Sequence, residues 1–315
     1  MPYVPKKQAF NAKINTVELG TGDKAVAIGG NNTYPFYSFD APTANTAKIG
    51  IEISDLALEE YKQPGLKEFY AGCTTVEEMA VRAQEMPGAS FIVLHLESAD
   101  PNGNNASVEE CTALAKRVAD AISMPLVIMG CKNIEKDAEL FTKISEALSG
   151  KNILVLSARE ENYKTVGASA VLAYGQKVGA ESAVDINLAK QLNTIITQLG
   201  VPAASIVMQA GSAAAGYGYE YVASTLDRIK GAALQASDAM LQMPIITPVA
   251  TETWGVKEAI LSEEEAPEGW GSAEERGIEM EVATAAACLT CGSDAVIMRH
   301  PASVKAIYDM INALA

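Results

Sequence analysis

The first side chains to consider for chemistry are the two histidines, His95 and His300. His95 lies within an apolar run, which predicts a buried strand position. His300 directly precedes a proline, which is typical of the start of a helix. A metal site would need these two histidines to converge with Glu97 and Asp185 from separate segments. We expect both histidines to be structural, and a metal-dependent barrel lyase or hydrolase that uses these four residues stays an alternative.

The five cysteines are dispersed through the chain, and only Cys288 and Cys291 form a C-x-x-C pair. An iron–sulfur or zinc site would need a second pair at a suitable spacing, and the sequence has none. The pair lies in an alanine-rich, helix-like stretch, which favours a packing role. An odd number of scattered thiols is typical of a reducing compartment. We therefore expect no iron–sulfur cluster in this chain and a cytoplasmic location.

Other catalytic motifs are missing from the sequence. It has no G-x-x-x-x-G-K-[ST] phosphate loop, no G-x-G-x-x-G between a strand and a helix, and no nucleophile elbow. The segment Gly211–Gly218 is instead rich in glycine and alanine. Such small residues let a flat ligand or another protein approach the backbone closely. A mobile loop without a ligand is the alternative interpretation of this segment.

An alternation of strands and helices predicts the scaffold that positions these residues. Several β-rich runs are continuously apolar, as in a parallel sheet that is buried on both faces. The runs are Ile49–Ile53, Phe91–Leu96, Leu126–Met129, Ile153–Leu156, Ala183–Ile186, Ile206–Met208, Ile245–Val249 and Ala295–Met298. Eight such strands predict an α/β fold, the TIM (β/α)8 barrel.

The segments between the strands have the pattern of amphipathic helices. Ser107 and Glu110 form a capping box at the start of one helix. A second helix is predicted to begin at Asn187 as the N-cap and to end at Gly200. The last helix has Pro301 in its first turn. These helices support the barrel interpretation.

A further segment precedes the first barrel strand. Thr16–Leu19 and Lys24–Ile28, joined by a glycine-containing turn, predict a β-hairpin. In barrels such a hairpin often closes one end. We divide the chain into residues 1–48, the hairpin and lead-in segment, and residues 49–315, the barrel. No linker of disordered composition separates them, so we expect a single domain.

Composition narrows the range of partners. Apolar residues make up 49% of the chain and charged residues 20%, which is typical of a globular protein. The net charge of −15 argues against nucleic acid, because phosphates require a basic surface. No apolar run reaches the ~18 residues of a membrane span, and no signal peptide is recognisable. We expect neither a nucleic-acid partner nor a membrane partner.

In a TIM barrel, function is located where the strands end and the following loops begin. The residues at these positions are Ser54, Asp55, Glu97, Ser98, Gly130, Cys131, Ser157, Asp185, Asn187, Gln209, Gly211, Thr247, Thr251, Arg299 and His300. Most are small and polar, and many can also cap the next helix. Strong catalytic groups are few, so we expect no catalytic residues in this chain.

One stretch of the sequence resembles a known family. Its motifs are Gly29-Gly30, Pro35-Phe36, Phe39-Asp40 and the run Ile49-Gly50-Ile51-Glu52-Ile53-Ser54-Asp55. In combination they resemble the small (delta-type) subunit of the corrinoid iron–sulfur protein from the anaerobic acetyl-CoA (Wood–Ljungdahl) pathway. The resemblance extends over the whole chain, including its length and the long insert before the last strand.

The resemblance implies a TIM-barrel subunit that pairs with a larger subunit carrying a [4Fe–4S] cluster and a corrinoid. The pair would move a methyl group from methyltetrahydrofolate, bound to a separate methyltransferase, to carbon monoxide dehydrogenase/acetyl-CoA synthase. A reductive activator is a further implied partner. The barrel would be non-catalytic and would cover the corrinoid, which is held mainly by the large subunit.

The implied corrinoid-facing site is the mouth of the barrel. We assign to it Asn187, Gln209, Gly211, Ser212, Gly216, Gly218, Tyr219 and Thr251. Neutral amides and hydroxyls suit the amide side chains of a corrin, and glycines permit close approach. A pterin-dependent (methyltetrahydrofolate) methyltransferase is the nearest alternative, with Asp185 and Asn187 on the fifth strand as pterin contacts.

Overall fold

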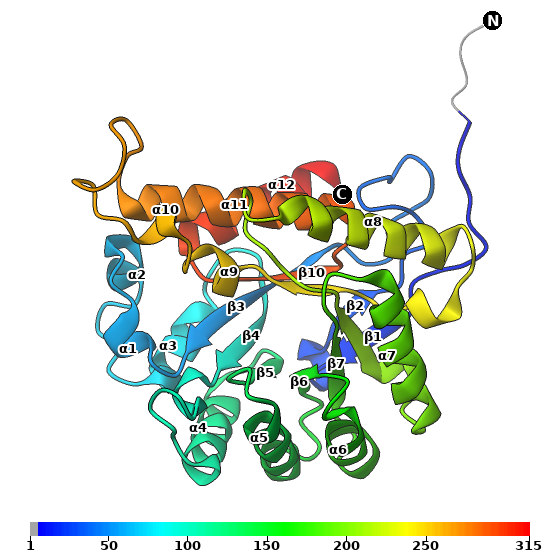
Figure 1. Cartoon of the computed structure of the whole chain (residues 1–315), viewed down its shortest axis with the longest axis horizontal. Helices are drawn as coiled ribbons and strands as arrows, with labels where there is room; N and C mark the ends of the chain where they lie inside the picture. Colours follow the sequence, from blue (N-terminus) through cyan, green and yellow to red (C-terminus); the bar gives the residue numbers. More distant parts are fainter. Residues whose placement is uncertain (1–5) are drawn as a thin grey trace, which may run out of the picture.

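The structure is a computed structural model that describes residues 6–315. Its centre is a sheet of eight parallel strands surrounded by helices (Figure 1). The strands are β3 (Lys48–Ser54), β4 (Ala89–His95), β5 (Leu126–Met129), β6 (Leu154–Ala158), β7 (Lys177–Glu181), β8 (Ile206–Gln209), β9 (Ile246–Pro248) and β10 (Ala295–Met298). They are ordered β8-β7-β6-β5-β4-β3-β10-β9, and a bridge between Met208 and Ile245 nearly closes the ring. The predicted TIM barrel is confirmed.

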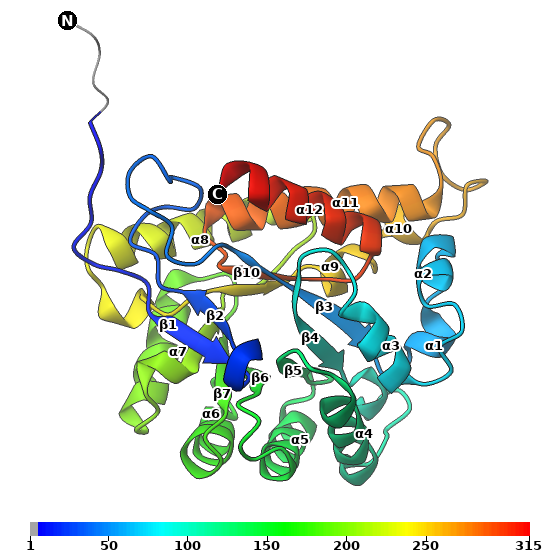
Figure 2. The same cartoon turned by 180° about the vertical axis from the view of Figure 1, so that it is seen from behind.

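The helices cover the outside of the sheet, as both views show (Figures 1 and 2). They are α1 (Ala57–Glu60), α2 (Pro64–Phe69), α3 (Val76–Ala83), α4 (Val108–Ala121), α5 (Ile134–Ala147), α6 (Tyr163–Val166), α7 (Ile186–Gln198), α8 (Tyr219–Leu234), α9 (Ala250–Thr253), α10 (Lys257–Ile260), α11 (Ala273–Cys291) and α12 (Pro301–Leu314). Shorter turns are η1 (Gly22–Lys24), η2 (Glu97–Ala99), the π-helical η3 (Gly167–Ala173), η4 (Ala203–Ser205) and η5 (Ala239–Leu241). The capping box of Ser107 and Glu110 begins α4 as predicted. None of the helices within residues 6–315 combines the length and apolarity needed to cross a membrane.

The N-terminal hairpin closes one end of the barrel. Strands β1 (Thr16–Leu19) and β2 (Val26–Gly29) pair antiparallel, which confirms the predicted hairpin. Its apolar side chains form one buried cluster with barrel-interior residues such as Phe91. The Gly20 amide donates a 2.9 Å hydrogen bond to the carbonyl of Asn152, which precedes β6. The hairpin therefore lies at the N-terminal ends of the strands, and the mouth at their C-terminal ends stays accessible.

The prediction of the fifth barrel strand is wrong. The strand is β7, residues 177–181, and the predicted segment Ala183–Ile186 is the loop that follows it and the start of α7. The strand has charged residues at both ends and Gly179 in its middle, so its sequence lacks an apolar run. The predicted N-cap of α7 is also wrong, because Asp185 caps the helix and Asn187 lies inside it. Asp185 accepts hydrogen bonds from the amides of residues 187 and 188.

Candidate functional site

The mouth of the barrel has one open half. A cavity of about 570 Å³ lies at the C-terminal ends of β5 to β9 and extends along α7. Four of the predicted site residues, Gln209, Gly211, Ser212 and Thr251, line it. The cavity has the size of a small-molecule site, since such sites are typically ~300–1,000 Å³.

Neutral polar groups form the floor of this cavity. The Ser157 hydroxyl donates a hydrogen bond to Oε1 of Gln209, and no partner for the Gln209 Nε2 group is found within residues 6–315. The Ser182 hydroxyl is buried and also lacks a partner in the described part of the chain. A buried polar atom without a partner costs roughly 1–3 kcal/mol, and this cost applies to the Ser182 hydroxyl. The Gln209 Nε2 group keeps access to the cavity and can donate to a ligand or to water. The cavity therefore presents one accessible amide donor beside a buried hydroxyl.

The cations at the rim of the cavity are paired with carboxylates. Arg159 forms a 2.6 Å ion pair with Glu181, the last residue of β7. Lys132 lies 3.6 Å from Glu252 in α9. The lining also includes Asp137, Glu160 and Glu161, so carboxylates outnumber the two cations. The opening is therefore acidic and disfavours an anionic ligand.

Gly211 allows the chain to turn sharply after β8. Its φ is +93°, a conformation that L side chains rarely adopt, and a Cβ here would lie 2.6 Å from the Val184 side chain. The loop then turns inward, so that Ala214 is buried and the Ala215 amide donates a 3.0 Å hydrogen bond to Thr284 on α11. Only the first part of the glycine- and alanine-rich loop therefore reaches the cavity.

The other four predicted site residues lie outside the cavity lining. Asn187 is exposed in the first turn of α7. Gly216 and Gly218 are in the turn that precedes α8, and a Cβ at Gly216 would meet nothing within 4 Å. The Tyr219 hydroxyl donates to Sγ of Cys291, 3.9 Å away on α11. The structure thus gathers half of the predicted set around one cavity.

A buried network of charges fills the other half of the mouth. Nδ1 of His95 lies 2.8 Å from Oε1 of Glu52, and an Arg299 guanidinium nitrogen lies 3.2 Å from the same oxygen. The guanidinium also lies over the Tyr61 ring, 5.1 Å from its centroid. Burial alone would raise the pKa of Glu52, but Arg299 and the hydrogen bond to His95 outweigh it and lower this pKa to about 2. Glu52 is therefore ionised at neutral pH although it is inaccessible to solvent.

No role was predicted for Glu52, although the sequence contains one signal for it. Glu52 is the only charged residue in the otherwise apolar run of Ile49–Ile53. A charged residue inside a buried strand requires a partner. The partner, Arg299, follows another strand 247 positions later. No local pattern connects the two residues.

Glu281, on α11, holds the backbone next to this network. Its two carboxylate oxygens accept hydrogen bonds from the amides of Arg299 and His300, at 2.6 and 3.2 Å. Glu281 is fully buried, and this burial raises its pKa to about 7. The group therefore titrates close to neutral pH.

We expect the stability of the folded chain to fall as pH rises from about 5 to about 7, in part because Glu281 must ionise while buried. A carboxyl group whose pKa is raised by folding stabilises the protein fully below its unfolded pKa and loses this contribution as pH rises through about 7. The Glu281 contribution should amount to about 3 kcal/mol at most. The measurement is the free energy of unfolding between about pH 5 and about pH 8 for the wild type and Glu281→Gln. Equal pH slopes for both proteins would contradict the assignment.

Only two of the four residues of the metal-dependent alternative come together, because Nδ1 of His95 lies 3.5 Å from Oε1 of Glu97. His300 stacks on Trp254, and its Nε2 lies 3.0 Å from Glu274. His95 belongs to the Glu52 network, and Asp185 caps α7. Across residues 6–315, His, Cys, Asp and Glu side chains nowhere gather in a group of three or more that could hold a metal ion.

Cys288 and Cys291 lie in the last turn of α11. Cys288 is buried, and this burial raises the pKa of its thiol to about 12. A thiol with such a pKa is a poor nucleophile and a poor metal ligand, since both roles require the thiolate. These surroundings agree with the predicted packing role.

Replacing both cysteines by alanine should therefore affect only stability. We expect Cys288→Ala/Cys291→Ala to lower the free energy of unfolding by about 1 kcal/mol per site and to leave partner binding unchanged. Thermal unfolding, and a binding titration with the larger subunit that the resemblance implies, check this. Loss of binding in a variant that still folds would give the pair a functional role.

Comparison with known proteins identifies the family. The family model for the CO dehydrogenase/acetyl-CoA synthase delta subunit matches residues 16–308. The acetyl-CoA decarbonylase/synthase complex subunit delta of Archaeoglobus fulgidus is 30% identical over 329 residues, covering 99% of this chain and 71% of the relative. Subunit delta 1 of Methanosarcina thermophila is 31% identical, covering 94% of this chain and 67% of the relative.

Solved structures show the same fold at low identity. Dihydropteroate synthase from Xanthomonas albilineans with 4-aminobenzoic acid superposes with a TM-score of 0.55 at 14% identity, covering 95% of this chain and 98% of the other. This likeness concerns the fold alone. The sequence match covers nearly the whole chain and agrees with the resemblance noted from residues 29–55. The chain therefore belongs to the CO dehydrogenase/acetyl-CoA synthase delta subunit family.

Proposed function

We propose that this chain is the non-catalytic barrel subunit of a corrinoid iron–sulfur methyl carrier. In this proposal the open half of its mouth covers a corrinoid that a larger partner subunit holds. The observation that carries the proposal is the cavity, whose lining includes the accessible Gln209 Nε2 group and the buried Ser182 hydroxyl, both without a hydrogen-bond partner within residues 6–315. Family membership supports it, because the relatives are named as subunits of an acetyl-CoA complex.

The residues of the cavity fit the edge of a corrin. A corrin carries amide side chains that both donate and accept hydrogen bonds. The Ser182 hydroxyl can do either, and the Gln209 amide can donate. The positive φ of Gly211 keeps the backbone close to the opening without a side chain. A cavity of about 570 Å³ has room for one edge of the macrocycle, and the partner would hold the remainder.

The bound corrinoid would supply a cobalt that carries the methyl group between partner enzymes. This chain would contribute shielding and orientation. His95 is unsuited to coordinate the cobalt, because the residue is only 4% exposed. Closing the mouth over the corrinoid would exclude water from it, as closed active sites do.

The remaining parts of the proposal concern the assembly. The [4Fe–4S] cluster would belong to the larger subunit. The methyltetrahydrofolate methyltransferase, carbon monoxide dehydrogenase/acetyl-CoA synthase and a reductive activator would be transient partners. We further propose that the chain works in the cytoplasm and folds as one domain.

The experiment is to mix the purified chain with the corrinoid-loaded partner subunit. The visible spectrum then follows the rate at which the reduced corrinoid is oxidised, with and without this chain. We expect a one-to-one complex and slower oxidation. A complex that leaves the oxidation rate unchanged would contradict the covering role.

Pterin binding is a second candidate for the same cavity. A pterin also presents an amide-like edge that could bond to Ser182 and Gln209, and one structure of the same fold, Yersinia pestis dihydropteroate synthase, is described with a pterine–sulfa conjugate. Against it, the Asp185 side chain is already engaged in capping α7. Titration of the isolated chain with methyltetrahydrofolate separates the candidates, because only the pterin site would bind without the partner.

A further inference from the structure

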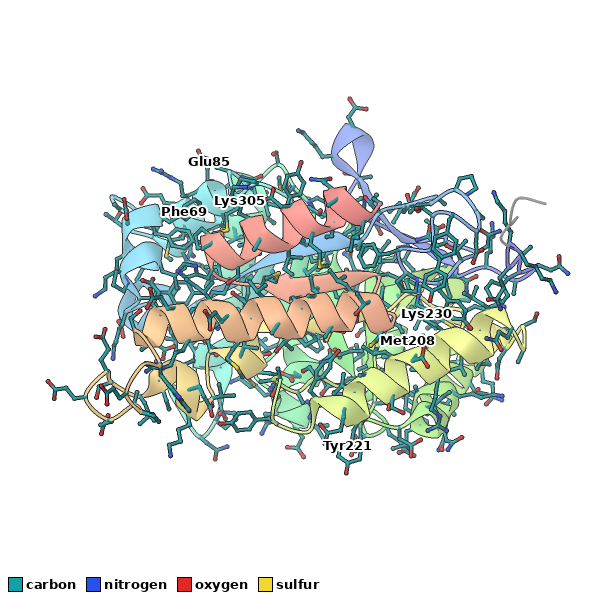
Figure 3. All side chains as sticks on the ribbon, turned by 90° about the horizontal axis from the view of Figure 1, so that it is seen from above. Phe69, Glu85, Met208, Tyr221, Lys230 and Lys305 are labelled. Carbon is teal, nitrogen blue, oxygen red and sulfur yellow. The ribbon has the colours of Figure 1, made fainter. Side chains whose placement is uncertain are left out.

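An acidic segment projects from the molecule beside the mouth. It runs from Lys257 to Gly271, comprising α10 and the loop before α11, and we call it the acidic projection. Its loop extends beyond the body of the protein (Figures 1 and 3, orange). It follows α9, whose residues Thr251 and Glu252 line the cavity, and Ala259 of α10 packs in one apolar cluster with Ala250 of α9.

A single buried arginine holds the base of the projection. The Arg276 side chain, on α11, donates hydrogen bonds to the backbone carbonyls of Glu258, Leu261 and Gly271. These carbonyls lie at both ends of the loop, so the guanidinium ties the two ends together. A small apolar core around Trp254, separate from the main core, packs beneath them.

The loop also has its own hydrogen bonds. The Ser262 hydroxyl and amide both donate to the Glu265 carboxylate, and the Glu265 amide donates back to the hydroxyl. The Trp270 amide donates to the carbonyl of Pro267 at 3.2 Å. Such preorganisation lowers the entropy that is lost when a surface binds a partner.

Two large apolar side chains are exposed on this support. Ile260 is 65% exposed and Trp270 is 46% exposed. Ile260 precedes Leu261 and Trp270 precedes Gly271, and the carbonyls of Leu261 and Gly271 accept hydrogen bonds from Arg276. Both exposed side chains therefore lie at the base of the loop. Tryptophan is among the residues that most often dominate the energy of protein interfaces.

The charge of the projection indicates the chemistry of its partner. The acidic projection contains five glutamates and one basic residue, Lys257. Glu263, Glu264, Glu265 and Glu268 are all exposed. A surface that complements them must carry lysine or arginine around an apolar pocket.

We propose that the acidic projection docks a basic, apolar-pocketed surface of the corrinoid-carrying partner subunit. Ile260 and Trp270 would be the anchors, and the glutamates would steer the approach. This inference rests on the proposed function, since it names the part of the chain that binds the same partner subunit.

The experiment is a binding titration of the full chain with the corrinoid-loaded partner subunit. We expect Ile260→Ser/Trp270→Ala to bind at least roughly thirtyfold more weakly, as for a central anchor. The control is Leu172→Ala, an equally exposed apolar residue in η3, which precedes β7 at the opposite end of the barrel. Its affinity should equal that of the wild type.

Charge is tested separately with Glu263→Gln/Glu264→Gln, which keeps the cap of Glu265 intact. We expect association roughly tenfold slower at low salt and a difference that disappears at high salt. Wild-type affinity in the folded anchor variant would overturn the docking inference and leave the proposed function standing. Failure of the wild type itself to bind would overturn both.

Discussion

Replacing Arg299 by methionine should lower the free energy of unfolding by about 3–5 kcal/mol. Glu52 is fully buried and would be left without its cationic partner. In the intact protein the pKa of Glu52 is about 2, since Arg299 and His95 outweigh the effect of burial. Denaturant unfolding at neutral pH measures the change.

The pH dependence of the same experiment has a defined sign. A carboxylate with a depressed pKa stabilises the folded state above its unfolded pKa, and this contribution is lost as pH falls through about 2. In Arg299→Met the isolated Glu52 would be easier to protonate. The difference between variant and wild type should therefore shrink as pH falls below the unfolded pKa of glutamate, roughly 4.3.

The matched control is the double variant Glu52→Met/Arg299→Met. Replacing both members of a buried pair by apolar residues is often close to neutral, so the double variant should be more stable than Arg299→Met alone. A single variant with nearly wild-type stability, or a double variant with additive losses, would show that the pair is not energetically coupled.

Filling the open half of the mouth should produce the largest functional effect. We expect Thr251→Trp to slow methyl transfer by the reconstituted complex on the order of a hundredfold, because even a small displacement of the reacting groups is costly. Thr251 lines the cavity and is only partly buried, so the barrel should still fold. The corrinoid spectrum of the complex should also change, which does not depend on turnover.

Two further variants make this prediction specific. Leu188→Trp fills the same cavity from α7, where the side chain is already partly exposed, and should reproduce the effect. Leu172→Trp adds the same bulk at a distant surface and should behave as the wild type. Normal methyl transfer and an unchanged spectrum in both cavity variants would show that the cavity does not face the corrinoid.

Most of the fold could be predicted because burial on both faces makes barrel strands continuously apolar. Seven of the eight predicted runs overlap a strand of the barrel, and the hairpin was found from its turn. The exception is β7, which has no continuous apolar run because Gly179 lies in its middle and charged residues lie at both ends. The strand has glycine at position 179 because a Cβ there would lie 2.3 Å from the Leu156 side chain inside the barrel.

The residues of the candidate site could be predicted only where the end of a strand determines their position. Gln209 and Gly211 directly follow the apolar part of β8, and the structure places both at the cavity. Gly216 and Gly218 were predicted from composition, yet the path of their loop depends on contacts with α11 that are distant in sequence. The pairing of Glu52 with Arg299 depends on the closure of the barrel in the same way.

Hydrogen exchange tests the central claim most directly. The backbone amides of residues 182–188 and 209–212 are measured in complexes with the corrinoid-loaded and the corrinoid-free partner subunit. We expect both segments to gain protection from exchange only when the corrinoid is present. Exchange in the hairpin at residues 16–29 should be unchanged. Equal protection with and without the corrinoid, or protection confined to other faces of the barrel, would contradict it.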